Sequence, residues 1–95
     1  MSTRKTTFTN SGINKLPNDK PVVYKIKTTN GANNYTGIAK RGRVQDRLKE
    51  HLPGGKDYIP GSSVQIEQMS SIADARAKEG RIISRSKPKH NIQGK

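Results

Sequence analysis

The chain lacks cysteine and tryptophan entirely, and it has a single phenylalanine among its 95 residues. Without cysteine, neither a disulfide framework nor a thiolate zinc site can stabilise the fold, which excludes the disulfide-rich scaffolds of small secreted proteins. Apolar residues make up only 28% of the sequence, so the composition predicts one small domain with a thin core.

Long apolar runs are also missing. No segment approaches the roughly 18 apolar residues that a membrane-spanning helix needs, and residues 1–9 carry no apolar stretch typical of a signal peptide. We therefore expect a cytoplasmic protein without a membrane partner, and delivery as a toxin payload stays open.

Acidic residues are scarce as well. Seven Asp and Glu stand against nineteen Lys and Arg, which gives a formal net charge of +12. Such an excess repels itself within a small domain, and binding to a polyanion relieves that repulsion. Nucleic acid is the leading partner class. An anionic membrane surface fits less well, because the sequence offers no long amphipathic helix with bulky apolar residues.

The first 20 residues are rich in Thr, Asn, Ser and Lys and hold few large apolar groups. They predict a flexible or loosely docked basic extension over residues 1–20, with Ile13 and Leu16 as possible anchors. Pro21 marks its end, and residues 21–95 are expected to form a single domain.

Within that domain, two kinds of periodicity alternate. Alternating apolar residues from Val22 to Lys27 predict a strand, and the favoured turn dipeptide Asn30-Gly31 joins it to a second strand. The expected elements are strands at residues 22–27, 34–39 and 64–67 and helices at residues 43–52 and 71–84. The sequence therefore predicts an α+β fold, in which helices flank a small three-stranded antiparallel sheet in the order ββαβα.

Tyr24 and Tyr35 lie on either side of the hairpin turn. Each is readily explained as a core aromatic with its hydroxyl at the surface. A phenol acts as a base only where cations favour the phenolate, since its unperturbed pKa is near 10. Such cations are close in the sequence, at Lys40, Arg41, Arg43 and Arg47. Gly37, inside the second strand, predicts a close approach by another backbone or a ligand.

Arg47 and His51 are four residues apart, so they share one face of the predicted helix. Arg47 has the geometry to hold a phosphate with two hydrogen bonds, and His51 can transfer a proton. The alternative is an ordinary solvated basic helix.

Glu79 stands on the apolar stripe of the last predicted helix, four residues after Ala75. A carboxylate moved into a core is costly unless it is paired or bound to a metal. The alternative is a residue at the rim of the core whose carboxylate reaches solvent or an arginine.

Taken together, these residues resemble the GIY-YIG nuclease domain. The two motifs that name the family correspond to Val22-Val23-Tyr24 and Tyr35-Thr36-Gly37, and its Arg-Leu-x-x-His segment corresponds to residues 47–51. The glutamate of its last helix matches Glu79, and its late asparagine matches Asn91. The resemblance covers roughly residues 20–93. The sequence departs from the family at Val22-Val23 and at Thr36, where the family has Gly-Ile and Ile.

The resemblance implies an endonuclease that hydrolyses phosphodiester bonds in DNA with one divalent cation, Mg²⁺ or Mn²⁺. It implies the metal ligand Glu79, a base or water-positioning role for Tyr24, and phosphate contact by Tyr35. It further implies charge stabilisation by Arg47, proton transfer or orientation by His51, and support of the cleft by Asn91. Substrate contacts are expected at Gly37, Lys40, Arg41 and Arg43.

Two questions stay open at this point. The first is whether the chain is instead a nucleic-acid-binding module that keeps this fold with weak or absent catalysis. The other is the substrate itself, which we expect to be duplex DNA with RNA not excluded, and whose selection a partner protein could supply.

Overall fold

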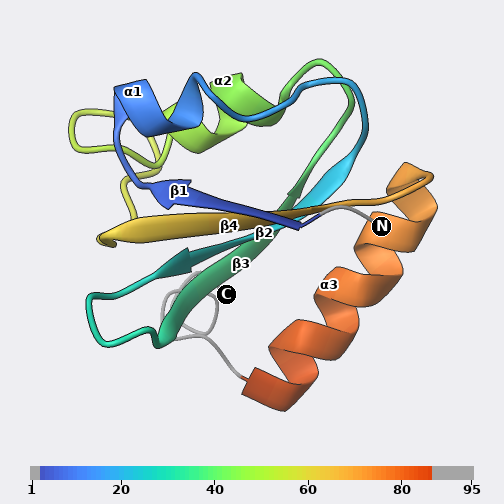
Figure 1. Cartoon of the computed structure of the whole chain (residues 1–95). Coiled ribbons are helices and arrows are strands. Elements are labelled where there is room, and N and C mark those ends of the chain that lie inside the picture. Colours follow the sequence, from blue (N-terminus) through green and yellow to red (C-terminus); the bar gives the residue numbers. More distant parts are fainter. Residues whose placement is uncertain (1–2, 87–95) are drawn as a thin grey trace.

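The computed structural model describes residues 3–86, which fold into one four-stranded antiparallel sheet with three helices (Figure 1). The strand order across the sheet is β1-β4-β2-β3, so β2 lies inside the sheet and β3 forms one edge. The elements in chain order are β1 (Thr3–Thr7), α1 (Asn10–Ile13), β2 (Val22–Lys27), β3 (Asn33–Ala39), α2 (Val44–Lys49), β4 (Ser63–Gln68) and α3 (Ile72–Ser86).

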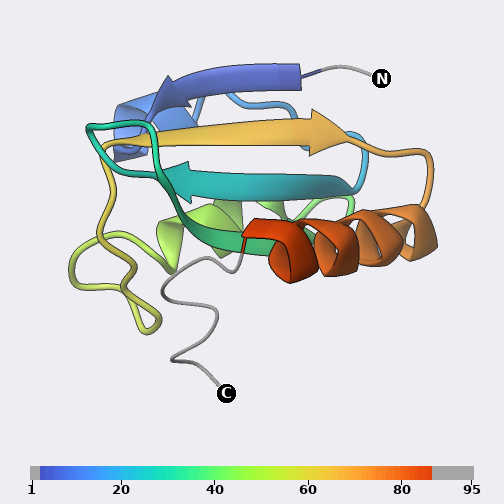
Figure 2. The same ribbon diagram turned by 90° about the horizontal axis from the view of Figure 1, so that it is seen from below.

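The alternation of β2 divides the core between the two faces of the sheet. Val22, Tyr24 and Ile26 point to the face that α1 and α2 cover, and they are completely buried there. Val23 points to the opposite face, where it packs with Met69 and with apolar residues of α3. Figures 1 and 2 show α3 on that second face, lying along β3. Each face of β2 thus receives its own helical layer.

The α+β class and the five elements expected after residue 20 are confirmed, with small shifts in their bounds. Gly31 adopts a φ of +84° in the predicted turn, a conformation that favours glycine. The helix α2 ends at Lys49, and a turn carries the chain on through His51 and Leu52, which are both buried. No helix within residues 3–86 is long and apolar enough to cross a membrane.

The number of strands was predicted wrongly, because residues 3–7 form a fourth strand. This segment pairs with β4 from Thr3 opposite Glu67 to Thr7 opposite Ser63. Its side chains are mostly exposed on both faces, so an edge strand held by main-chain hydrogen bonds shows no apolar alternation in the sequence.

The same finding corrects the expected extension over residues 1–20. Phe8, Ile13 and Leu16 are buried in the core that also contains Tyr24. Thr9 caps α1, since its hydroxyl accepts a hydrogen bond from the main-chain nitrogen of Gly12 at 3.1 Å. The described part of this segment therefore belongs to the domain, and Ile13 and Leu16 are core residues rather than loose anchors.

Candidate functional site

Tyr24 and Gly37 stand opposite each other in the β2–β3 ladder, and this pairing builds the floor of the site. The Tyr24 ring lies across Gly37 so closely that a Cβ atom at position 37 would lie 2.5 Å from the phenol oxygen. The close approach predicted for Gly37 is therefore real, and the group that approaches is the Tyr24 side chain rather than a backbone or a ligand. Gly37 is needed because any larger residue would displace the phenol.

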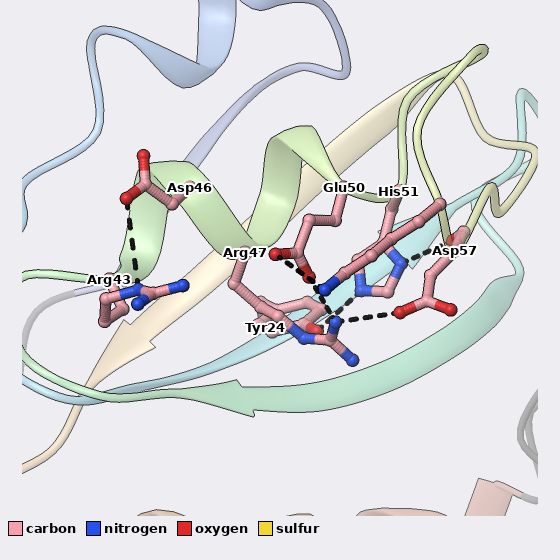
Figure 3. A network of polar contacts seen from close by, with 8 residues as sticks. Tyr24, Arg43, Asp46, Arg47, Glu50, His51 and Asp57 are labelled. Atoms are coloured by element: carbon pink, nitrogen blue, oxygen red, sulfur yellow. Dashed lines mark hydrogen bonds and ion pairs between the residues drawn. The ribbon is translucent and has the colours of Figure 1, made fainter.

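The Tyr24 hydroxyl is hydrogen-bonded to Nε2 of His51 at 2.8 Å (Figure 3). The other ring nitrogen of His51, Nδ1, lies 2.7 Å from the main-chain oxygen of Asp57. A carbonyl oxygen only accepts, so Nδ1 carries the proton and donates it to Asp57, and Nε2 of the neutral ring accepts the hydrogen bond from Tyr24. A main-chain group thus fixes both the tautomer of His51 and the direction of the phenol O–H.

Tyr35 completes a cluster of three rings with Tyr24 and His51. Its ring centroid lies 5.0 Å from that of His51 and 6.1 Å from that of Tyr24, with tilted planes. Such tilted contacts stabilise aromatic groups and restrict their rotation. Tyr35 is partly exposed, whereas Tyr24 and His51 are both 0% exposed, so Tyr35 lies between the buried pair and solvent.

Burial raises the pKa of Tyr24 well above its usual value, because the charged phenolate would lose its hydration. The nearby Tyr35 adds to this effect, and Glu79 contributes through its negative charge. Arg47 acts in the opposite direction through its charge and a hydrogen bond, but it does not overcome burial. The condition that cations favour the phenolate is therefore not met, and Tyr24 is a neutral hydrogen-bond donor.

Burial also lowers the pKa of His51, with a further lowering by the positive charge of Arg47. The hydrogen bond to the main chain of Asp57 raises the pKa, but less than burial lowers it. His51 is therefore neutral at pH 7, which agrees with its role as the acceptor for Tyr24.

Arg47 is held by two carboxylates at the entrance to this cluster. Its Nη1 atom bonds Oε1 of Glu50, one helical turn along, and Oδ2 of Asp57 at 3.0 Å (Figure 3). Burial lowers the pKa of Arg47, but the hydrogen bonds to Glu50 and Asp57 raise it, and the pKa lies above its usual value. Arg47 in turn holds the pKa values of Glu50 and Asp57 below their usual range through its hydrogen bonds.

A shallow hollow of about 350 Å³ adjoins Arg47 on the surface between β3 and α2. It brings together two of the predicted substrate contacts, Lys40 and Arg43, with Arg47. Its full lining consists of Ile38, Ala39, Lys40, Arg43, Arg47, Glu50 and Lys56. Arg41 is exposed and is not part of this lining.

Glu79 belongs to α3, the helix that packs on the other face of the sheet. It is half-buried on α3, and its negative charge contributes to the raised pKa of Tyr24. Within residues 3–86, no group of three or more His, Cys, Asp or Glu side chains is placed to hold a metal. One carboxylate still fits Mg²⁺, which keeps several of its waters and takes few protein ligands. Asn91 lies outside the described residues.

The sequence did not single out Glu50 or Asp57. Glu50 follows Arg47 by three residues on one helix, so the i,i+3 spacing could have identified it as a partner. Asp57 comes from the loop after α2, and no spacing rule predicts that its carbonyl meets one site residue and its carboxylate another.

Comparison of the chain with protein-family models, with curated proteins and with solved structures found no match. The resemblance to the GIY-YIG nucleases therefore rests on the residues quoted above.

Proposed function

We propose that this protein is a metal-dependent endonuclease that hydrolyses phosphodiester bonds in DNA. The observation that carries the proposal is the cluster of Tyr24, Tyr35, Arg47 and His51, which come from three separate segments of the chain. In this cluster a phenol, a neutral imidazole of fixed tautomer and an arginine meet in a protein of net charge +12.

The proposed proton path runs through Tyr24 to His51. A water attacking phosphorus gives one proton to the Tyr24 oxygen while the phenol passes its own proton to Nε2 of His51. The remaining hydroxyl oxygen forms the new bond to phosphorus, the bond to the leaving oxygen breaks, and the leaving oxygen takes a proton from solvent water. This relay avoids a free phenolate, which the raised pKa of Tyr24 makes inaccessible near pH 7. The imidazolium that forms is stabilised by the carbonyl of Asp57.

Arg47 is proposed to bind the reacting phosphate. It lies beside the phenol and borders the basic hollow with Lys40 and Arg43. Preorganised cations of this kind are most effective where negative charge grows in the transition state. Glu50 and Asp57 hold the guanidinium in place before substrate arrives, and part of this pairing must be exchanged for phosphate oxygens.

Glu79 is proposed to hold the divalent cation. The proposal is supported by the electrostatic effect of the Glu79 carboxylate on Tyr24 and by the preference of Mg²⁺ for carboxylate oxygens. A bound Mg²⁺ or Mn²⁺ would neutralise charge on the phosphate and lower the pKa of a bound water.

A second function, nucleic-acid binding without hydrolysis, is favoured by one specific observation. Tyr24 and His51 are completely buried, and Arg47 is already paired with two carboxylates. Cleavage therefore requires Tyr35 or Arg47 to move and admit water, whereas binding alone does not.

The deciding experiment compares cleavage of a supercoiled plasmid, and of a labelled RNA, with Mg²⁺, with Mn²⁺ and with a chelator. We expect Tyr24→Phe to lower the rate about 10²- to 10⁴-fold, the usual contribution of a positioned acid or base. Tyr58→Phe is the matched control, since Tyr58 is 51% exposed and lies outside the cluster. If the parent protein binds duplex but cuts neither plasmid nor RNA with either metal, the binding-only function is correct. If Tyr24→Phe and Glu79→Gln cut like the parent, the site is wrong.

A further inference from the structure

The face of the sheet opposite the tyrosine cluster is basic. Two lysines of β2, Lys25 and Lys27, alternate along the strand and point to this face. Lys5 of β1 points to the same face, because it lies opposite the β4 residue that also faces Lys25 in the sheet. The helix α3 packs against β3 and β2, and Figure 2 shows it along one side of the sheet, with β1 and β4 beyond it. The lysines therefore form the floor of a surface that α3 borders on one side.

The wall of this surface is a basic stripe on α3. Arg81 and Ile82 lie three and four residues after Lys78, and Arg85 lies four and three residues after them, so all four share one side of the helix. Together with Lys25 they line a groove of about 290 Å³. We call these five residues the α3 groove.

Little negative charge balances the groove. Lys78 is paired with Glu67 of β4 at 2.7 Å. Within residues 3–86, the Lys25, Arg81 and Arg85 side chains form no ion pair or hydrogen bond. On the floor beside the groove, desolvation and then the positive charges of Lys25 and Lys5 lower the pKa of Lys27. Lys27 donates a hydrogen bond to Gln65 at 2.8 Å, so among the cations of this surface Lys25, Arg81 and Arg85 are the ones left without a partner within residues 3–86.

The groove is not built for single strands. Proteins that bind single-stranded nucleic acid combine basic grooves with aromatic side chains on which bases stack. The chain has four aromatic residues, Phe8, Tyr24, Tyr35 and Tyr58, and none of them lines this groove. Tyr24 and Phe8 are buried in the core on the other face. Cations without a stacking surface suit the outside of a duplex, where phosphates are the accessible groups.

We propose that the α3 groove binds the phosphate backbone of duplex DNA, as a second contact separate from the tyrosine cluster. The proposal takes DNA as the polyanion and so rests on the proposed function. Because the groove and the tyrosine cluster lie on opposite faces of the sheet, the groove anchors DNA without touching the bond that is cut. Binding in the α3 groove is independent of the DNA sequence, since every contact is to phosphate.

The test measures binding of a labelled duplex in chelator over a range of salt concentrations, where no metal-dependent cutting occurs. The groove variant is Lys25→Gln/Arg81→Gln/Arg85→Gln. The matched control is Arg4→Gln/Lys15→Gln/Lys20→Gln, which removes the same charge from exposed positions outside the groove. Far-ultraviolet circular dichroism and thermal unfolding verify that both variants fold. The charge-conserving variant Lys25→Arg/Arg81→Lys/Arg85→Lys must bind like the parent.

We expect the slope of log K against log salt to become shallower by about 2 to 3 for the groove variant, since each phosphate contact contributes roughly 0.9. At low salt the affinity should fall roughly 100-fold, with a much smaller loss in the control. Equal losses in the groove variant and the control would mean that only net charge matters and would overturn the proposal. A parent that binds a single strand as tightly as the duplex would also contradict it.

The same proteins separate this inference from the proposed function. If the groove variant loses duplex binding while no protein cuts plasmid, the groove is supported and hydrolysis is refuted. If plasmid is cut with Mg²⁺ and the groove variant binds like the control, hydrolysis stands and the groove is refuted.

Discussion

Replacing Gly37 with alanine tests the geometry on which the site depends. A Cβ atom at this position would lie 2.5 Å from the Tyr24 oxygen, 2.6 Å from its Cζ and 3.0 Å from Cε2 of Tyr35. To restore ordinary contact at 3.4 Å, the phenol and the β3 backbone must separate by about 0.9 Å (3.4 − 2.5). Tyr24 is fully buried, so the ring has no free space to enter.

Two effects of Gly37→Ala follow from that displacement. Overpacking of a tight core costs about 1–3 kcal/mol, and we expect the free energy of unfolding to fall by that amount. The 2.8 Å bond from Tyr24 to His51 is also stretched or misaligned. A misplacement near 1 Å can cost about 10²-fold in rate, so nicking should fall by that order if the site is catalytic.

Gly80→Ala is the matched control, because it makes the same glycine-to-alanine replacement and is expected to change the free energy of unfolding in the opposite direction. Gly80 lies within α3, and an added Cβ would meet no atom within 4 Å. Alanine there should stabilise the protein by about 0.5–1 kcal/mol, since glycine is a poor helix former.

Urea unfolding gives both stabilities, and the NMR signals of the His51 ring report whether its bond to Tyr24 persists. The reasoning is refuted if Gly37→Ala is as stable as the parent and leaves the His51 signals unchanged. A loss of activity with unchanged His51 signals would instead point to a role of position 37 in contacting substrate.

Three further results are expected. The pKa of His51 is lowered in the fold, so the unfolded chain binds more protons than the folded protein between that lowered pKa and about 6.5, and the free energy of unfolding should fall as the pH drops through this window. A His51→Gln protein should lack that part of the pH dependence in urea titrations. An identical pH profile in the two proteins would contradict the burial of a neutral His51 ring. Asp57→Asn removes one carboxylate from Arg47 but keeps the main-chain acceptor of His51, so duplex affinity measured by anisotropy should rise several-fold, whereas weaker binding would contradict a holding role for Asp57. Ile13→Ala should destabilise the protein by about 2–5 kcal/mol in urea, because Ile13 is fully buried, and a loss below 1 kcal/mol would mean that the N-terminal segment is only loosely docked.

The periodicity of apolar residues was sufficient to predict the hairpin and the helices, because the residues of their buried faces recur at strand or helix spacing. Val22, Tyr24 and Ile26 alternate, and Val44 and Leu48 recur at helical spacing. The edge strand β1 escaped prediction because it is held by main-chain hydrogen bonds that any residue can make.

The candidate site was predictable in part. Helix spacing alone placed Arg47 beside His51, whereas Tyr24 was grouped with them on the GIY-YIG resemblance, and the three side chains do lie together. The direction of the shift in the Tyr24 pKa was not predictable. Four nearby cations in the sequence suggest a stabilised phenolate, and only the fold shows that burial outweighs them. The acceptor for His51 is a loop carbonyl, and no side-chain pattern encodes it.

The pairing of β1 with β4 sets an order of events during synthesis. Thr3 pairs with Glu67, 64 positions later (67 − 3), and β4 is the one strand that β1 pairs with in the part of the chain that the structure describes. The β2–β3 hairpin can close as soon as its own residues leave the ribosome, whereas the first strand must wait until β4 emerges. Its threonines, arginine and lysine keep it hydrated during that delay. We therefore expect β1 to join the sheet no earlier than β4.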